Sequence, residues 1–409
     1  MLDLPVLVIE APPGQRPLIF AWGVSSFYGW GVNGLNLMLA LADHPTVSPF
    51  GAVPFGPSDV VLDPLRQARL GALAVQSQVL WDALGRSESP ALRLSAPLLV
   101  GLGHDFAGMG ELGGRRLSGS PTIGVAFLEQ ASLGPNARER ANELALIIAG
   151  SQWNETILRS AGIRAVTTVL QGIDTSLFHP APRSGTIPGE RFVIFSGGKL
   201  ELRKGQDLVL AAFRAFHARH PEALLLAAWH SPWSDLMRSA VAHPGVTRPR
   251  PAADTTPDVI GWAVANGIPA DSVISVGAAP NIAMPHVIRE ADVALFPNRA
   301  EGGTNLVAME CMACGIPTIL SANTGHLDLL GQPDIAIPLV RQSTVVHRDG
   351  LDTTYWGESD VEEMVNALET VWRDRTAAKV MGQRAATAMA SLDWKTQTNK
   401  LLRAIDPLL

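Results

Sequence analysis

The sequence predicts an α/β protein built from two halves, each with a parallel sheet covered by helices. Three observations carry this prediction: short apolar runs alternate with amphipathic segments, the alternating series occurs twice, and a segment rich in proline and glycine separates the two series. The chain has 409 residues, of which 47% are hydrophobic and 17% charged, so each half can bury its own core. A nucleotide-sized cleft is expected between the halves.

The first half alternates strands and helices up to residue 170. Short apolar runs bounded by polar residues or glycine predict buried strands, and a helix is expected to stop at Gly162. The predicted strands are Pro17–Ala21, Ala96–Val100, Thr122–Ala126, Leu144–Ala149 and Val166–Leu170, and the predicted helices are Asn33–Ala42 and Gln152–Ala161.

The segment Pro180–Gly189 carries no core pattern and is the predicted linker. A second alternating series follows it, and the chain is helical from Ser359 onward. The domains expected from this pattern are 1–182, 190–390 and a final helical segment 391–409. The predicted strands are Phe192–Ser196, Ala223–Trp229, Val273–Val276, Val293–Phe296 and Thr318–Leu320, and the predicted helices are Gly205–His220, Met284–Glu290, Asn305–Cys314, Asp360–Arg373, Ala377–Ala390 and Trp394–Ala404.

Composition excludes several classes of protein. Lys and Arg total 32 and Asp and Glu total 38, a net charge of −6, which argues against a nucleic-acid partner. Two cysteines exclude a disulfide scaffold and fit a reducing compartment. No apolar run approaches the roughly 18 residues of a membrane-spanning helix, and the first residues do not resemble a signal peptide. A cytoplasmic protein is therefore expected, with no transmembrane segment; peripheral membrane contact and the oligomeric state are left open.

A first glycine-rich motif spans Gly29–Gly34, between a predicted strand and a predicted helix. Its spacing fits a loop in which backbone N–H groups approach a pyrophosphate. The acidic residue that normally accompanies a dinucleotide site is missing between Asp43 and Asp59. A tight turn with nothing bound and a flexible loop lining the cleft are the alternatives.

A second motif, Ser196–Gly205, places two glycines and three cations between a strand and a helix. Lys199 and Lys204 flank a turn, so both can point toward one anion, and each charge-assisted bond to a phosphate contributes about 1.5–3 kcal/mol. The alternative is a solvated basic turn.

The third motif, Pro297–Pro317, contains a glycine-bearing loop with Glu301 and a helix that is expected to start near Thr304. Free N–H groups at that helix start can hold a phosphate. Glu310 has apolar neighbours, which predicts a buried hydrogen-bond acceptor. Cys311 and Cys314 lie beside Met and Ala in the same helix, so they are expected to be core residues.

The second and third motifs, in this order, resemble the donor half of a GT-B glycosyltransferase of the retaining family-4 type. The matching residues are Gly198-Lys199, Lys204-Gly205, Glu301-Gly302-Gly303 and the run from Glu310 to Pro317. Lysine stands at position 199 where the family usually has arginine, and eight residues separate the two glutamates where the family has seven. The lead-in segments Ser151–Gly162 and Gln171–Pro180, and the final helix with Trp394, are also similar to the family.

The resemblance implies a GT-B fold of two Rossmann-like parallel-sheet domains facing a central cleft, with a C-terminal helix crossing back to the N-domain. It implies a metal-independent transfer of a sugar from a nucleoside diphosphate sugar to an acceptor hydroxyl with retention. The alternatives are a GT-B nucleotide-sugar epimerase and a non-catalytic sugar-nucleotide-binding subunit. The expected partners are the nucleotide sugar and a glycan, lipid-linked or protein acceptor, with no further cofactor and no metal.

The same resemblance assigns roles to individual residues. Glu310 is expected to bind the ribose and Glu301 the donor sugar, while Glu129 or the alternative His104-Asp105 pair serves the acceptor side. The His-Asp pair is otherwise expected to form a structural hydrogen bond. The candidate catalytic residues are Glu301, Glu129 and Lys204, and the candidate donor-binding residues are Gly31, Gly198, Lys199, Arg203, Lys204, Gly302, Gly303, Thr304, Asn305 and Glu310.

Overall fold

The chain divides into two compact units. The computed structural model describes residues 4–231, 240–249, 257–346 and 351–408. Unit 1 comprises residues up to Asp174 together with Pro280–Ile282 and the chain from Leu392 onward, and unit 2 comprises Thr175–Ala279 and Ala283–Ser391.

The expected linker does not mark the boundary between the units, which lies between Asp174 and Thr175. The segment 180–189 belongs to unit 2, where its polar groups are bonded. Ser184 donates through its N–H and its hydroxyl to Glu290 at 2.7 and 2.6 Å, and Arg183 pairs with Asp292 at 2.6 Å. The proline-rich composition correctly indicated irregular structure in this segment. Its contacts with Glu290 and Asp292 attach the segment to unit 2.

Unit 1 is organised by a six-stranded sheet in which every pair of neighbouring strands is parallel. The order of strands along the chain reverses between β2 and β5, which are neighbours in the sheet. In spatial order the strands are β10 (Val166–Thr168), β9 (Leu146–Ala149), β8 (Thr122–Ala126), β5 (Leu98–Leu102), β2 (Arg16–Phe20) and β3 (Val47–Gly51). A smaller sheet contains β1 (Val6–Leu7), β4 (Ala91–Leu94), β7 (Arg115–Ser118) and β6 (Glu111–Leu112).

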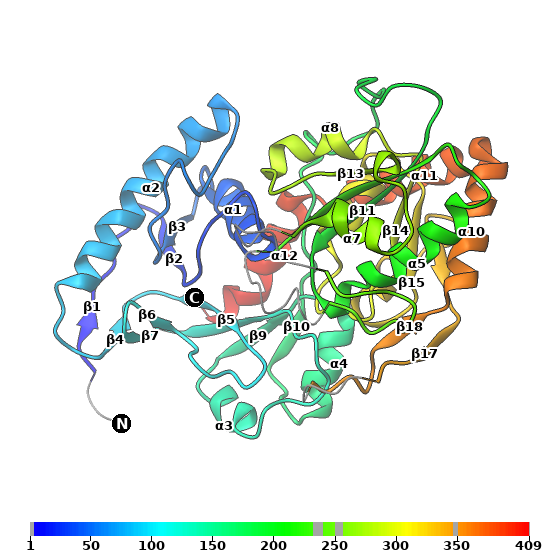
Figure 1. Cartoon of the computed structure of the whole chain (residues 1–409). Coiled ribbons are helices and arrows are strands. Elements are labelled where there is room, and N and C mark those ends of the chain that lie inside the picture. The colour runs from blue at the N-terminus through cyan, green and yellow to red at the C-terminus, as the bar shows by residue number, and fades with distance from the viewer. Residues whose placement is uncertain (1–3, 232–239, 250–256, 347–350, 409) are drawn as a thin grey trace. The chain divides into compact units, whose positions relative to one another are not determined.

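The helices of unit 1 begin where side chains satisfy their first N–H groups. Asp63 caps the 22-residue helix α2, with Pro64 in its first turn, and Ser151 caps α4. The C-terminal helix α12 packs against α1 within this unit. The helices are α1 (Gly29–Leu41), α2 (Pro64–Gly85), α3 (Ala137–Ala141), α4 (Gln152–Ser160) and α12 (Trp394–Ile405) (Figure 1).

Unit 2 repeats the plan with a second six-stranded parallel sheet. Its strand order reverses between the neighbours β11 and β14. In spatial order the strands are β13 (Val273–Ser275), β12 (Ala223–His230), β11 (Phe192–Lys199), β14 (Val293–Phe296), β15 (Thr318–Ser321) and β16 (Ile337–Leu339). An antiparallel pair, β17 (Gln342–Thr344) and β18 (Gly357–Ser359), lies outside this sheet.

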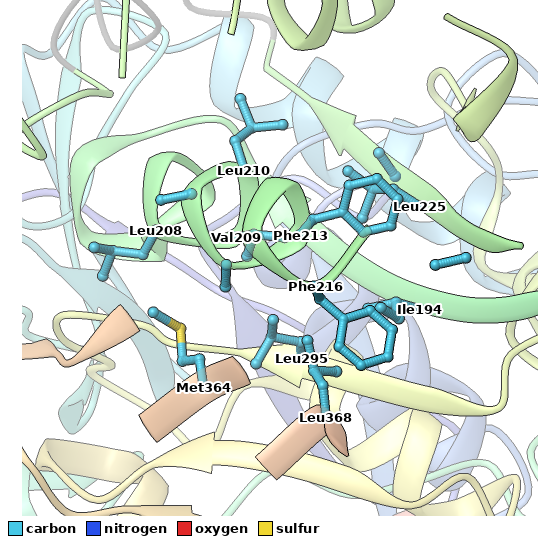
Figure 2. Close-up of a cluster of buried hydrophobic side chains, with 14 of the residues drawn as sticks. Ile194, Leu208, Val209, Leu210, Phe213, Phe216, Leu225, Leu295, Met364 and Leu368 are labelled. Carbon is cyan, nitrogen blue, oxygen red and sulfur yellow. The ribbon is translucent and has the colours of Figure 1, made fainter. Parts of the chain in front are cut away.

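One face of the unit 2 sheet is buried by two helices. Phe213 and Phe216 of α5 pack with Ile194 of β11 and with Met364 and Leu368 of α10 (Figure 2). Each of these side chains is fully buried, so this cluster is the core of the unit. The helices described in unit 2 are α5 (Gln206–His217), α7 (Val259–Ala265), α8 (Met284–Ile288), α9 (Leu306–Ala313), α10 (Val361–Arg373) and α11 (Arg375–Ala390).

The glycine-rich motif Gly29–Gly34 is not a loop, because helix α1 already begins at Gly29. The alternatives of a tight turn and of a flexible loop were wrong, and the helix begins four residues earlier than predicted. Two of its glycines allow close packing: a Cβ on Gly31 would lie 2.4 Å from the Cβ of Ser25, and a Cβ on Gly34 would lie 2.6 Å from Nε1 of Trp22. The glycines therefore bring α1 close to the segment that follows β2.

No helix in the part of the chain that the structure describes is both long enough and apolar enough to cross a membrane.

Two alanine substitutions test the packing of α1. In a helix, alanine is favoured over glycine by about 1 kcal/mol, and a Cβ added to Gly71 of α2 would meet nothing within 4 Å. Gly71→Ala is therefore expected to stabilise unit 1 by about 0.5–1 kcal/mol. Gly34→Ala should instead destabilise it by about 1–3 kcal/mol, because the added methyl group meets Trp22. Denaturant unfolding measures both variants, and a Gly34→Ala protein as stable as Gly71→Ala would contradict this packing.

Candidate functional site

The candidate site in unit 2 lies where the strand order of its sheet reverses. The segments that follow β11 and β14 carry the second and third sequence motifs, and these two strands are neighbours. In open α/β sheets, ligands bind outside the carboxyl ends of the strands at this point. The fold therefore brings together the two motifs that the sequence separates by almost one hundred residues.

In the first segment of the site, Ser196–Gly205, the buried side chain of Lys204 packs against Gly198. Strand β11 continues to Lys199, three residues farther than predicted, and Gly198 has a φ of +132°, which disfavours any residue with a Cβ. A Cβ there would lie 3.6 Å from Cδ of Lys204. The Lys204 side chain is 10% exposed, whereas that of Lys199 is 35% exposed. The alternative of a solvated basic turn is thus wrong for Lys204.

Glu301, in the segment after β14, binds two of the three cations of the first segment. Its Oε1 accepts from Nζ of Lys204 at 2.5 Å, and its Oε2 accepts from Nη1 of Arg203 at 3.0 Å. Asn298 donates to Oε1 as well. Arg203 also pairs with Glu201 at 2.5 Å, so cations and carboxylates alternate. Lys204, Arg203 and Glu301 form one buried ion cluster, called the ion cluster below.

Burial and charge shape the ionisation of this cluster. Burial would raise the pKa of Glu301, but the charges of Lys204 and Arg203 lower it to about 2. Burial lowers the pKa of Lys204, and Glu301 acts against that effect. The carboxylate is therefore ionised at neutral pH, and it favours the charged form of the lysine.

Arg299 holds the Glu301 segment against the first segment, a role that was not predicted from the sequence. Its guanidinium makes a two-pronged ion pair with Asp207, at 2.8 and 2.9 Å, and both side chains are 0% exposed. It also donates to the carbonyl of Leu202 at 2.9 Å and to Glu358 at 2.9 Å. Asp207 lies in the first turn of α5. Acidic residues are common there because they interact favourably with the helix dipole, so the sequence does not mark Asp207 as the partner of a distant arginine.

Helix α9 begins at the same strand-order reversal, and no side chain caps its start. Asn305 precedes the helix with a φ of +64° and makes no capping hydrogen bond. Its amide instead donates to Nε2 of His326, at 3.0 Å, because Nδ1 of that ring lies 3.2 Å from the carbonyl of Ser321 and carries the proton. Burial lowers the pKa of His326 to about 4, with the nearby charge of Glu301 opposing and that of Lys204 assisting. The ring is neutral at pH 7.

Close contacts around this loop leave no room for a side chain at Gly325 or at Gly197. A Cβ on Gly325 would lie 1.8 Å from the carbonyl oxygen of Gly303, and Gly325 donates its N–H to the carbonyl of Glu301 at 3.0 Å. Gly302, Gly303 and Thr304 are buried beside it. A Cβ on Gly197 would lie 2.8 Å from Val307, so the first turn of α9 packs directly on β11.

Glu310 and the two cysteines occupy α9. Glu310 is 4% exposed, which agrees with the buried acceptor expected from its neighbours. Cys311 and Cys314 are free and buried, and burial raises the pKa of Cys311 well above its usual range and that of Cys314 to about 12. Both are therefore unreactive core residues, as the sequence indicated.

The remaining site candidates lie in unit 1. Gly31 is buried inside α1. Glu129 follows β8 and is partly exposed, and His104 follows β5. Asp105 pairs with Arg140 and accepts from the N–H of Asn136, so no hydrogen bond joins it to His104 among the described contacts. The hypothesis of a structural His-Asp hydrogen bond was wrong.

The chain is similar to known glycosyltransferases in sequence. A family model described as "Family 4 Glycosyltransferase in conflict systems" matches residues 281–401. The GDP-mannose-dependent α-(1-6)-phosphatidylinositol monomannoside mannosyltransferase of Mycolicibacterium smegmatis is 23% identical over 243 residues, which are 56% of this chain and 53% of that protein. The D-inositol 3-phosphate glycosyltransferase of Acidothermus cellulolyticus is 28% identical over 167 residues, 40% and 34% respectively. The chain thus matches about half of the first relative and a third of the second.

Two solved structures resemble the chain over almost its full length. Sucrose-phosphate synthase from Thermosynechococcus elongatus has a TM-score of 0.62 at 16% identity and covers 96% of this chain and 99% of that one. Anabaena HepE in complex with UDP-glucose has a TM-score of 0.62 at 14% identity and covers 96% and 100%.

The fold and the structural matches together define the class of protein. Two units that each carry a Rossmann-like parallel sheet have the GT-B fold of glycosyltransferases. Within that class, the sequence supports a family-4-like glycosyltransferase, because residues 281–401 match the family-4 model and both relatives are named as glycosyltransferases. The resemblance and the fold class inferred from the sequence are both confirmed.

The buried histidine of the site predicts a pH dependence of stability. The folded-state pKa of His326, about 4, lies below the unfolded-state value of about 6.5, so the unfolded chain binds more protons between these pH values. Neutral, buried His326 therefore contributes fully to the free energy of unfolding above pH 6.5, and this contribution is lost as the pH falls toward 4. The loss amounts to about 3 kcal/mol. Glu301, with its pKa of about 2, adds a further loss below about pH 4.5.

Denaturant unfolding at pH 7 and pH 4.5 measures this effect. His326→Gln should show a smaller loss of stability between the two pH values than the unsubstituted protein. His286→Gln, at an exposed position of α8, is the matched control and should keep the full loss. An equal loss in His326→Gln and His286→Gln would contradict the neutral, buried state assigned to His326.

Proposed function

We propose that the chain transfers a glycosyl group from a nucleoside diphosphate sugar to an acceptor hydroxyl, with retention and without a metal ion. The observation that carries this proposal is the ion cluster, which holds Lys204 and Arg203 beside the start of α9 at the strand-order reversal of unit 2. The relatives support the donor class. One is named for its dependence on GDP-mannose, and HepE was solved with UDP-glucose.

The charges of the site suit a diphosphate. Three cations, Lys199, Arg203 and Lys204, face two carboxylates, Glu201 and Glu301, which leaves one positive charge in excess. An ammonium has three N–H donors. The contacts described for Lys204 use one of them, so the others can reach a phosphate oxygen. The uncapped N-terminus of α9 adds backbone donors and a favourable dipole.

We assign Glu301 a positioning role in place of the direct contact to the donor sugar that the sequence suggested. Both of its oxygens already accept hydrogen bonds from the cations and from Asn298. A carboxylate bonded in this way fixes the lysine and the arginine in one geometry before the donor arrives. Glu310 remains the proposed ribose-binding residue, since it is the buried carboxylate of α9.

Electrostatic stabilisation of the leaving group is the proposed source of catalysis. As the bond between the sugar and the diphosphate breaks, negative charge grows on the phosphate oxygens. Preorganised donors aimed at such charge usually make the largest contribution to rate. In the retaining reaction implied by the family, the leaving phosphate accepts the proton of the acceptor hydroxyl. The cations supply the neutralising charge that a metal ion would otherwise provide.

A titration of two lysine variants tests the donor site. UDP and GDP are titrated into the protein by calorimetry in excess EDTA. Loss of one charge-assisted bond costs about 1.5–3 kcal/mol, so Lys204→Ala should bind the preferred diphosphate at least tenfold more weakly. Lys379→Ala removes an equal charge from an exposed position of α11 and should bind normally.

Two results would contradict the proposal. Unchanged affinity in a folded Lys204→Ala protein would remove the lysine from the donor site. Binding that disappears in EDTA and returns with Mn²⁺ would contradict metal independence. Donor turnover without any acceptor would favour the epimerase, and donor binding without turnover on any acceptor would favour the non-catalytic subunit.

A further inference from the structure

An aromatic cluster lies at the strand-order reversal of unit 1. Trp22 follows β2, Trp30 lies in the first turn of α1 and Phe127 follows β8. The rings of Trp22 and Trp30 meet edge to face with centroids 5.6 Å apart, and those of Trp30 and Phe127 do so at 4.8 Å. Because β2 and β5 are the neighbours between which the strand order reverses, this is the position in unit 1 at which open α/β sheets bind ligands.

Each of the three rings rests on a glycine. A Cβ on Gly34 would lie 2.6 Å from Trp22, one on Gly101 would lie 3.4 Å from Trp30, and one on Gly150 would lie 2.2 Å from Phe127. Gly101 lies within β5, where a glycine weakens the strand and often marks a close approach. The three glycines therefore leave room for the rings to pack closely against the backbone, and Gly101 does so at a cost to strand β5.

Trp30 is nevertheless 37% exposed. More than a third of the Trp30 side chain is therefore accessible to a ligand, while the rest of the ring packs in the aromatic cluster. A fixed, partly exposed indole offers a flat apolar surface that loses little conformational entropy when a ligand binds. Its π-face is electron-rich and attracts the C–H groups of a ring stacked on it.

Polar groups lie at the same edge of the sheet. His104 follows β5 and Glu129 follows β8, which are neighbouring strands, and Phe127 is two residues before Glu129. Nδ1 of His104 is buried and has no hydrogen-bond partner among the described residues. An aromatic surface beside a few polar groups is typical of a small-molecule site in which apolar area gives affinity and hydrogen bonds give orientation.

We propose that Trp30 is the platform on which the acceptor stacks, and that the acceptor presents a hydroxylated six-membered ring, either a pyranose or a cyclitol. Such a ring has a C–H face for the indole and hydroxyl groups at its rim for His104 and Glu129. The inference rests on the proposed function, because it names the acceptor class of that reaction. It assigns to unit 1 a binding residue that is separate from the ion cluster of unit 2.

Ligand binding, measured without any turnover, tests this proposal. Methyl α-glucopyranoside, methyl α-mannopyranoside and myo-inositol are examined by saturation-transfer NMR with the full chain. At least one probe should receive saturation on the C–H protons of one ring face. Trp30→Ala should reduce that signal at least fivefold, while Trp30→Phe, which keeps an aromatic face, should retain most of it. A response to the glycosides alone identifies a pyranose, and a response to inositol alone identifies a cyclitol.

Matched controls separate stacking from misfolding and from donor binding. Tyr355→Ala removes a 59% exposed aromatic ring from unit 2 and should leave the signal unchanged. Trp30→Ala should remain folded at the temperature of the measurement, with a lower unfolding midpoint because part of the aromatic cluster is lost, and it should keep the diphosphate affinity of the unsubstituted protein. The proposal is overturned if no probe binds, if Trp30→Ala keeps the signal, or if Trp30→Ala weakens diphosphate binding, which would assign the indole to the nucleotide base.

The two proposals fail in different ways. A chain that binds the probe through Trp30 but binds no nucleoside diphosphate would contradict the proposed function and leave the platform intact. If the chain transfers sugar and Trp30→Ala leaves the KM for the acceptor unchanged, the proposed function stands and the stacking role of Trp30 is contradicted.

Discussion

The proposed donor site of unit 2 depends on the buried ion pair between Arg299 and Asp207. Both side chains are 0% exposed, and removing one partner of such a pair typically costs about 3–5 kcal/mol because the other charge stays buried. Here the charges are well compensated. Asp207 also accepts from the N–H groups of Ala242 and His243, and Arg299 also donates to Leu202 and Glu358. One guanidinium thus joins the start of α5, the segment after β14 and strand β18.

The Arg299–Asp207 pair positions the residues of the ion cluster. The N–H of Arg299 donates to the carbonyl of Arg203 at 2.6 Å, which brings Glu301, two residues farther, into reach of Arg203 and Lys204. Neutral His326 and Asn305 then fix the start of α9 beside the same loop. A site arranged in this way holds its cations rigidly before a ligand arrives, which is the requirement for electrostatic catalysis.

The sequence predicted most strands of the two six-stranded sheets, because buried parallel strands are short apolar runs. Strands β8 and β14 have the predicted bounds, whereas β3 and β16 were missed. The sequence also missed α2, whose exposed face carries Leu65, Val75 and Val79, so that no single apolar face marks the helix. Among the site residues, the motifs placed Lys204 and Glu301 on neighbouring loops. Neither the contact between them nor the Arg299 pair was predictable, because each joins residues more than ninety positions apart.

The most direct test of this account replaces Arg299 by lysine. Lysine keeps the charge but cannot make the two-pronged bond to Asp207 or reach Leu202 and Glu358 at the same time. Calorimetric titration of the folded Arg299→Lys protein with its preferred nucleoside diphosphate should show affinity about tenfold weaker, although Arg299 is fully buried. A stable Arg299→Lys protein with unchanged diphosphate affinity would contradict the dependence of the ion cluster on this pair.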